Sequence, residues 1–236
     1  NLPQSRHSRW ANLGRQLHRF SEGMKRPHQE RYWRWATLQN EEEANYLMRE
    51  KLIIREQRLS DDAYAYKKRK DRWLRHIRKE GNFRDVLYTD MELVLPNDML
   101  TKVDMMSMAN SLEVRTPFLD HRLVNFAFSL PVRFKINTNM TKKILQDAFR
   151  SRLPAELYQR PKQGFEVPLL PWFQSELRSR IESDWLQDDF IDEQQVFNPD
   201  AIRHLKQKLF SSNPGDTPAT VWALIVFQHW WKRYLG

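Results

Sequence analysis

The spacing of the apolar residues is the feature that most constrains this fold. Apolar side chains recur at intervals of three and four residues along most of the chain, and no segment alternates apolar and polar residues over a sustained run. The sequence holds six glycines, no two of them adjacent, which argues against an all-β fold with many tight turns and against a Gly-rich phosphate-binding loop. We therefore expect a predominantly all-α protein, with one helical (sub)domain across residues 1–236.

Helix start and stop signals divide this pattern into segments. Asn40, Asn82 and Thr141 occupy positions typical of N-caps, and Gly81 occupies a position where a helix ends. The last helix is apolar on most sides, so we expect it to be buried. The pattern predicts helices at about 1–23, 28–39, 40–52, 60–81, 83–94, 98–111, 119–129, 141–152, 168–185, 198–209 and 219–235.

Composition excludes several kinds of chemistry. The chain has no cysteine, which excludes a disulfide framework, a Cys-ligated zinc site and a Cys nucleophile. No apolar run approaches the roughly 20 residues of a membrane span, and no secretory signal pattern is present. The chain begins with Asn1 rather than Met, so we expect it to be processed or to be a fragment.

The net charge of +9 indicates either a solvated basic surface or an anionic partner. The basic residues are spread along the predicted helix faces, which favours the solvated surface. The run Lys67-Lys68-Arg69-Lys70 is the strongest basic cluster and could bind an anion or nucleic acid.

Charged residues interrupt an apolar pattern between residues 95 and 120. The stretch LPNDMLTKVDMMSMANSLEVRTPFLD places Asp98, Glu113 and Arg115 among apolar residues spaced for burial, including Met106 and Phe118. Buried charges are costly unless they are paired or bind a ligand. We expect Asp98 and Lys102 to share one helix face, and Met105, Met106 and Met108 to line a core or cavity.

A second motif places two cations around a proline and a glycine. The run Arg160-Pro161-Lys162-Gln163-Gly164-Phe165 lies between two predicted helices. A rigid turn that presents a lysine suits an anionic ligand better than it suits packing.

Together, the run at 95–120 and the segment LPAELYQRPKQGF at 153–165 resemble the C-terminal half of the synthetase domain of the glutamine-hydrolysing asparagine synthetase family. The pieces SLEVRTPFLDHRL and RPKQGF carry the specific part of this resemblance. It implies the helical C-terminal half of an adenine-nucleotide α-hydrolase-like (PP-loop) synthetase domain, whose parallel sheet lies upstream and is missing from this chain.

The resemblance also implies a two-step reaction. A carboxylate, that of the aspartate side chain, attacks the α-phosphorus of ATP to give an acyl-adenylate and pyrophosphate, and ammonia derived from glutamine then displaces AMP to form asparagine. Both transition states gain negative charge, which cations stabilise. The complete enzyme is expected to use ATP and Mg²⁺, with none held by this chain alone, and to be cytoplasmic.

Individual residues take their expected roles from the same resemblance. Lys162 matches the catalytic lysine of the family. Arg160 is a candidate phosphate contact or, equally, the partner of an acidic residue elsewhere. Asp98 matches an acidic residue that the family places near the amine or the amino-acid substrate, although a helix N-cap is an equally simple role. Glu113 and Arg115 form either a buried ion pair or a wall of the substrate site. No metal ligand is assigned.

The sequence also departs from the family pattern. A Ser-Gly-Gly-x-Asp-Ser pyrophosphate loop is absent, since the chain contains no Ser-Gly or Gly-Gly pair. We therefore expect the chain to be inactive alone and to need upstream nucleotide-binding and glutaminase portions. Self-association as a homo-oligomer is a further expectation.

Two rival functions stay open. A related amide-forming cyclase, similar to β-lactam synthetase, shares the architecture. A basic helical module that binds nucleic acid would explain the charge and Lys67–Lys70, but it would leave the two motifs unexplained.

Overall fold

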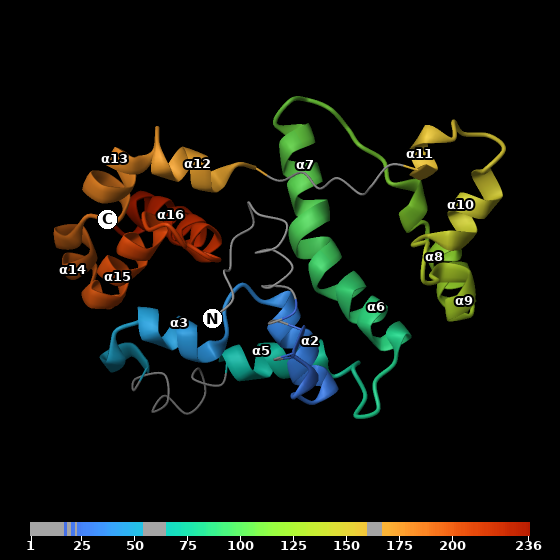
Figure 1. Ribbon diagram of the computed structural model, residues 1–236, viewed down its shortest axis with the longest axis horizontal. Helices are drawn as coiled ribbons and strands as arrows, with labels where there is room; N and C mark the ends of the chain where they lie inside the picture. Colours follow the sequence, from blue (N-terminus) through green and yellow to red (C-terminus); the bar gives the residue numbers. More distant parts are fainter. Residues whose placement is uncertain (1–16, 18–19, 22, 54–64, 160–166) are drawn as a thin grey trace. The chain divides into compact units, whose positions relative to one another are not determined.

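The computed structural model describes residues 17, 20–21, 23–53, 65–159 and 167–236. In this part of the chain, every regular element is a helix (Figure 1). Two isolated β-bridges, Met48–Phe197 and Ile136–Thr141, are the extended pairings among these residues. The predominantly α-helical fold is confirmed, and the PP-loop assignment stays a prediction.

The contacts divide the chain into two compact units. Unit 1 comprises residues 1–80 and 167–236, and unit 2 comprises residues 81–166. The expectation of one helical (sub)domain over residues 1–236 stays a prediction, and each unit is described by itself.

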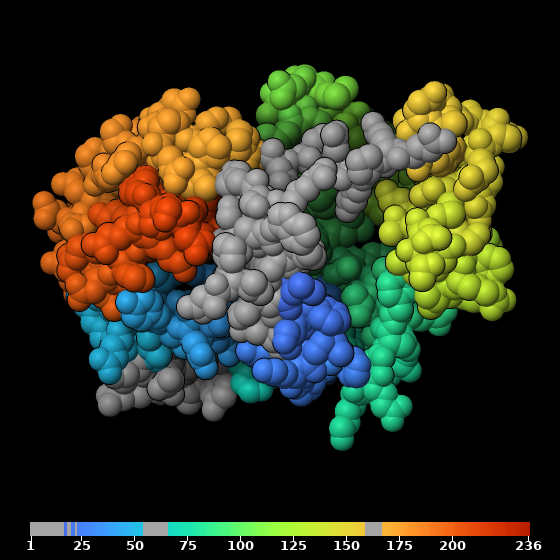
Figure 2. Space-filling model, viewed as in Figure 1, coloured from blue at the N-terminus to red at the C-terminus, as the bar shows by residue number. Residues whose placement is uncertain are grey.

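Unit 1 contains helices from both ends of the chain. They are α2 (His28–Ala36), α3 (Glu41–Leu47), α5 (Ala65–Leu74), α12 (Leu169–Gln174), α13 (Arg178–Arg180), the π-helix η3 (Ile181–Trp185), α14 (Asp188–Gln194), α15 (Pro199–Leu209) and α16 (Thr217–Tyr234). Figure 2 shows the orange-to-red segment from α12 to α16 as one closely packed mass.

A single hydrophobic core holds much of unit 1 together. Helices α15 and α16 contribute most of it, and Leu47 of α3 joins it from far away in the sequence. The core comprises Leu47, Phe173, Ile181, Leu186, Ile191, Phe197, Ala201, Ile202, Leu205, Leu209, Val221, Leu224 and Ile225. Removing this much apolar surface from water is the main stabilising contribution to the unit.

Helix α16 buries one face rather than all sides. Val221, Leu224 and Ile225 are buried, whereas Trp222 and Trp230 are 48% and 47% exposed. The expectation that this apolar helix is buried against the rest of the protein is therefore confirmed for one face only. The described core contacts only the face that carries the i, i+3, i+4 residues, and the opposite apolar stripe stays in water.

Unit 2 consists of short helices. They are α6 (Phe83–Glu92), the π-helix η1 (Leu95–Leu100), α7 (Thr101–Met108), the 3₁₀ helix η2 (Pro117–Leu119), α8 (His121–Ser129), α9 (Val132–Lys135), α10 (Lys143–Phe149) and α11 (Glu156–Gln159). Among its described residues, only Asp85 and Thr89 are buried. Unit 2 thus lacks a fully buried hydrophobic side chain in the part that the structure describes.

Several predicted caps are confirmed. The side chains of Asn40 and Asn82 each accept a hydrogen bond from the backbone three residues on, and each begins a capping box. Thr141 is not a cap, because α10 starts after Lys142, whose backbone is left-handed at φ 54°. The helix expected at 168–185 is three helices, since the backbone breaks at Ser175, which ends α12.

Helix ends account for the other differences. The helix expected at 98–111 begins earlier, in η1, and ends at Met108. Pro117 begins the 3₁₀ helix η2, which lies just before α8. Most of the helix expected at 1–23 and the start of that expected at 60–81 lie outside the described residues.

Candidate functional site

The candidate residues of the first motif lie on η1, α7 and the segment that follows. Pro96 lacks a backbone N–H and stands in the first turn of η1. Two side chains donate hydrogen bonds to backbone carbonyls there. Asn97 donates to the Leu93 carbonyl at 2.8 Å, and Thr101 donates to the Pro96 carbonyl at 2.6 Å. A π-helical turn is uncommon and is often found at functional sites.

Asp98 and Lys102 share one face of this helix, as predicted. The Lys102 Nζ atom lies 3.8 Å from the Asp98 Oδ1 atom, and both side chains are exposed. Asp98 does not cap the helix, because it lies in the fourth position of η1. An exposed i, i+4 ion pair contributes only a few tenths of a kcal/mol, so both groups remain accessible to a ligand.

Glu113 and Arg115 also form an ion pair, but it is not buried. The Arg115 Nη2 atom lies 2.6 Å from the Glu113 Oε1 atom, and the side chains are 84% and 70% exposed. The expected burial is wrong, because this segment lies between α7 and η2 with no described element packed over it. Among the described residues, no hydrogen bond or ion pair joins this pair to Asp98.

The apolar residues around these charges are exposed as well. Met105, Met106, Met108, Leu112 and Phe118 each keep more than half of their surface in water. The prediction that the methionines line a core is wrong for the described structure. We call these five residues the α7 surface.

Asp120 is the N-cap of α8. Its Oδ1 atom accepts a hydrogen bond from the Arg122 backbone at 2.9 Å, and its carboxylate also accepts two from the Arg122 guanidinium. The Arg122 side chain, helped by the backbone bonds, lowers the pKa of the Asp120 carboxyl. Asp120 therefore stabilises the start of α8.

The second motif is not described by the structure. Arg160 and Lys162 both lie outside the described residues, so their expected roles stay predictions. In the described ranges, no group of three His, Asp or Glu residues could hold a metal ion. No helix in those ranges is long and apolar enough to span a membrane.

An apolar groove of about 400 Å³ lies within unit 2. Helices α6, η1 and α8 supply most of its wall, and two charged residues, Asp90 and Lys135, also line it. The sequence pattern did not predict this groove, because its lining residues come from segments about 40 positions apart. The remaining lining residues are Leu87, Met91, Val94, Leu95, Met99, Ala127, Phe128, Leu130 and Ile144.

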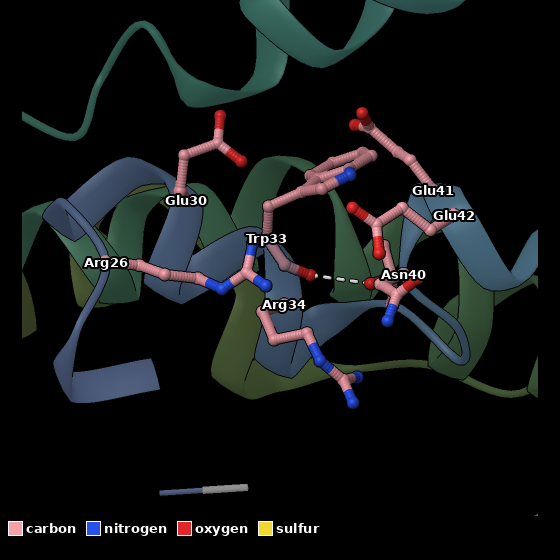
Figure 3. A pocket seen from close by; sticks show the side chains of 8 residues that line it. Arg26, Glu30, Trp33, Arg34, Asn40, Glu41 and Glu42 are labelled. Atoms are coloured by element: carbon pink, nitrogen blue, oxygen red, sulfur yellow. Dashed lines mark hydrogen bonds between the residues drawn. The ribbon is translucent and has the colours of Figure 1, made fainter. Parts of the chain in front are cut away.

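A smaller polar pocket of about 120 Å³ lies in unit 1 beside α2 and α3 (Figure 3). Figure 3 shows the indole of Trp33 between Glu30 and Glu41, with Arg26 and Arg34 below it. The dashed line marks the hydrogen bond from the Thr37 hydroxyl to the Trp33 carbonyl, at 2.8 Å.

Lys70 connects the helices around this pocket. Its Nζ atom lies 2.9 Å from the Glu30 carboxylate and 2.8 Å from the Glu41 carboxylate, and its side chain is 11% exposed. Burial tends to lower the pKa of Lys70, but the two carboxylates outweigh it and the pKa is raised. Lys67 is paired with Asp71 at 2.6 Å. Half of the basic run is therefore neutralised within the protein, which weakens the case for nucleic-acid binding.

The fold and the candidate site define a basic helical protein, and the candidate charges among its described residues lie in exposed ion pairs. A family model described as asparagine synthase matches residues 1–232. This chain belongs to the asparagine synthase family.

Curated relatives agree with this family. The glutamine-hydrolyzing asparagine synthetase 1 of Bacillus subtilis (strain 168) is 30% identical over 156 residues, which are 63% of this chain and 24% of that protein. A putative glutamine-hydrolyzing asparagine synthetase of Mycobacterium bovis is 41% identical over 88 residues, 37% of this chain and 14% of that protein.

A vertebrate relative is about as similar to this chain as the Bacillus subtilis protein is. The glutamine-hydrolyzing asparagine synthetase of Gallus gallus is 29% identical over 140 residues, 57% of this chain and 22% of that protein. The chain thus spans less than a quarter of the length of these curated relatives. No solved structure matches the chain significantly.

Proposed function

We propose that this chain is the helical part of a synthetase that activates a carboxylate with ATP and then forms an amide. The favoured substrate is the side-chain carboxylate of aspartate, and the favoured product is asparagine, made with ammonia from glutamine. The observation that carries the proposal is the family match over residues 1–232. The motif RPKQGF at 160–165 supports it, because it supplies a lysine of the kind that the reaction needs.

In this proposal, Lys162 stabilises negative charge that develops on the phosphate oxygens during adenylation. A lysine ammonium is a compact point charge that suits this role. Arg160 assists at the phosphates. Asp98 contacts the amino-acid substrate, while Glu113 and Arg115 form a wall of the site. The exposure of these three described residues supports this part of the proposal, because a ligand can reach them.

A partner completes the site in this proposal. The α7 surface supports this idea, since an exposed cluster of large apolar side chains usually marks an interaction face. The partner is an upstream portion that carries the parallel sheet of a PP-loop domain, with a glutaminase portion beyond it. A cytoplasmic location and a homo-oligomeric state are further parts of the proposal.

The nucleotide and Mg²⁺ are assigned to that upstream portion. The described residues do not fit a metal site, because they include no cluster of three acidic or histidine ligands. A nucleotide-binding glycine loop is also absent from the sequence. We therefore propose that this chain holds neither ATP nor Mg²⁺ by itself.

The test is pyrophosphate release from ATP, measured for this chain alone and for the full-length gene product that contains it. Each protein is given aspartate with glutamine, then a panel of other carboxylates. We expect release by the full-length protein with aspartate, formation of asparagine, and no release by the chain alone. Release by the chain alone would disprove the assignment of the nucleotide site.

The same assay separates the rival functions. Intramolecular amide formation without glutamine or ammonia would identify a cyclase instead. If no carboxylate supports release but the protein binds nucleic acid with a steep loss of affinity in added salt, the enzymatic proposal fails.

A further inference from the structure

Lys135 lines the apolar groove of unit 2, and Arg84 shares a hydrogen-bond acceptor with it. The Arg84 Nη2 atom donates to the Phe128 carbonyl at 2.5 Å, and the Lys135 Nζ atom donates to the same carbonyl at 3.3 Å. The guanidinium of Arg84 and the ammonium of Lys135 therefore lie close together, because both contact the same carbonyl oxygen. Phe128 and Lys135 line the groove together with one carboxylate, that of Asp90, and Arg84 adjoins this wall through the Phe128 carbonyl.

Neither cation is paired with a carboxylate among the described residues. Lys135 has one carbonyl as a hydrogen-bond acceptor and lies over the Phe128 ring at 5.4 Å, which leaves ammonium donors unused. Burial, and then the charge of Arg84, lower the pKa of Lys135. Two like charges that share one oxygen beside an apolar surface are poorly compensated.

Part of this arrangement has a structural explanation. The Phe128 carbonyl lies in the last turn of α8, where carbonyls need donors and cations are favourable. One cation satisfies that need. The second cation and the adjoining groove are not explained by capping, because a cap requires neither a second charge nor a concave apolar wall.

The volume and lining of the groove fit a small molecule. A volume of about 400 Å³ falls in the usual range for ligand pockets, which are mostly apolar with a few polar groups that fix orientation. Leu87, Met91, Leu95 and Met99 form an apolar track beside the cation pair. A carboxylate suits such a pair, since guanidinium and ammonium groups bind it with strong charge-assisted hydrogen bonds.

We propose that this groove binds a small amphipathic carboxylic acid, with its carboxylate at Arg84 and Lys135 and its apolar body along Leu87, Met91, Leu95 and Met99. None of the residues assigned to amide formation lines the groove, although Met99 of the lining is next to Asp98 in η1, and the proposal does not depend on that function. Because the readout is binding rather than activity, failure of one proposal leaves the other intact.

The test is isothermal titration of the 236-residue chain with decanoate, compared with decanol as an uncharged analogue of the same length. We expect decanoate to bind at one site and decanol to bind about tenfold more weakly, since it cannot form the charged contacts. Lys135→Gln and Arg84→Gln should each weaken decanoate binding by about tenfold and leave decanol binding unchanged.

Two further variants make the test specific. Arg133→Gln is the matched control, because Arg133 lies on the same helix as Lys135 but over the Phe134 ring and away from the groove lining. It should leave both affinities unchanged. Met99→Glu changes a residue that is already 43% exposed and should abolish decanoate binding, because it adds a second carboxylate to the groove besides that of Asp90.

Three results would overturn the proposal. Equal binding of decanoate and decanol would show that the cations do not recognise the ligand. Equal loss of affinity in Arg133→Gln and Lys135→Gln would show a nonspecific effect of charge. A chain that dimerises without binding decanoate would show that a second copy, rather than a small acid, occupies the groove.

Discussion

Lys70 shows how a residue with an apparent role in ligand binding can instead connect helices. It is one of four consecutive basic residues, yet it contacts Glu30 of α2 and Glu41 of α3. Tyr66 reinforces this arrangement, since it accepts a hydrogen bond from the Trp33 indole at 2.9 Å and donates one to Glu41 at 3.0 Å. Sequence alone places Lys70 on a basic helix face but cannot show which distant acids meet it.

We predict that Lys70→Met lowers the free energy of unfolding by about 1 kcal/mol at neutral pH, because it removes two charge-assisted hydrogen bonds from partly exposed carboxylates. Lys67→Met is the matched control. Its i, i+4 pair with Asp71 is exposed on both sides, so we expect a loss of only about 0.3 kcal/mol. Urea denaturation of the three proteins measures both values.

The effect of Lys70→Met should also depend on pH. The Lys70 hydrogen bond is the main cause that lowers the pKa of Glu41 below its ordinary value of 4.5, with burial opposing it and Tyr66 assisting. A carboxyl group whose pKa is lower in the folded state than in the unfolded state stabilises the protein at pH values above the unfolded-state pKa. This stabilisation is lost as the pH falls through the folded-state pKa. The stability difference between wild type and Lys70→Met should therefore shrink between pH 5 and pH 3. A constant difference across this range would contradict the ion-pair assignment.

At the scale of elements, a buried amide pair joins α14 to α16. Gln194 donates to Gln228 at 2.6 Å, and Gln228 donates back at 3.0 Å. Both side chains are buried beside the apolar core of unit 1. Each amide needs the other, because a buried polar group without a partner is costly.

We expect Gln228→Ala to destabilise unit 1 by about 2–3 kcal/mol, since it leaves the Gln194 amide unpaired and creates a cavity. The double variant Gln194→Leu/Gln228→Leu should cost less than the single variant, because it removes both polar groups together. Thermal unfolding of both proteins tests this order. A double variant that is the less stable of the two would refute the explanation.

The residues at which helices begin were easier to predict than the burial of their side chains. Asn40, Asn82 and Asn198 are N-caps with local hydrogen bonds, and local chemistry is visible in sequence. The burial of Met106 and Phe118 was predicted wrongly, because apolar spacing shows which residues could pack but not whether a neighbour is present. The Glu113–Arg115 pair was predicted correctly as a pair and wrongly as buried for the same reason.

At the scale of the whole molecule, the two units differ in how they are stabilised. Unit 1 has a contiguous core that includes residues of α3, α12, α14, α15 and α16. In the described part of unit 2 only Asp85 and Thr89 are buried, and they lie on one helix. Local opening should therefore require less free energy in unit 2 than in unit 1.

Hydrogen exchange should show this difference directly. We predict slow amide exchange in residues 201–209 and 221–228, where buried side chains cover the helices. Exchange in residues 101–115 should be at least about tenfold faster for the chain alone. Equal protection of both regions would show that unit 2 is as stable as unit 1 and would remove one reason for expecting a partner.

The sequence predicted which residues belong to the candidate site, but not how those residues are arranged in space. RPKQGF and SLEVRTPFLD identified the family, and the family match over residues 1–232 supports them. The groove of unit 2 had no such signal, because Arg84 and Lys135 meet only through the carbonyl of Phe128. Sites assembled from distant segments require the fold before they can be recognised.

The central claim is that Lys162 belongs to the active site of an amide-forming synthetase. The most direct test measures aspartate-dependent pyrophosphate release by the full-length protein with Lys162→Ala and, as the matched control, with Lys68→Ala, an exposed lysine of the basic run. We predict a loss of at least about 100-fold for Lys162→Ala and no change for Lys68→Ala. Equal activity of wild type, Lys162→Ala and Lys68→Ala would contradict the claim.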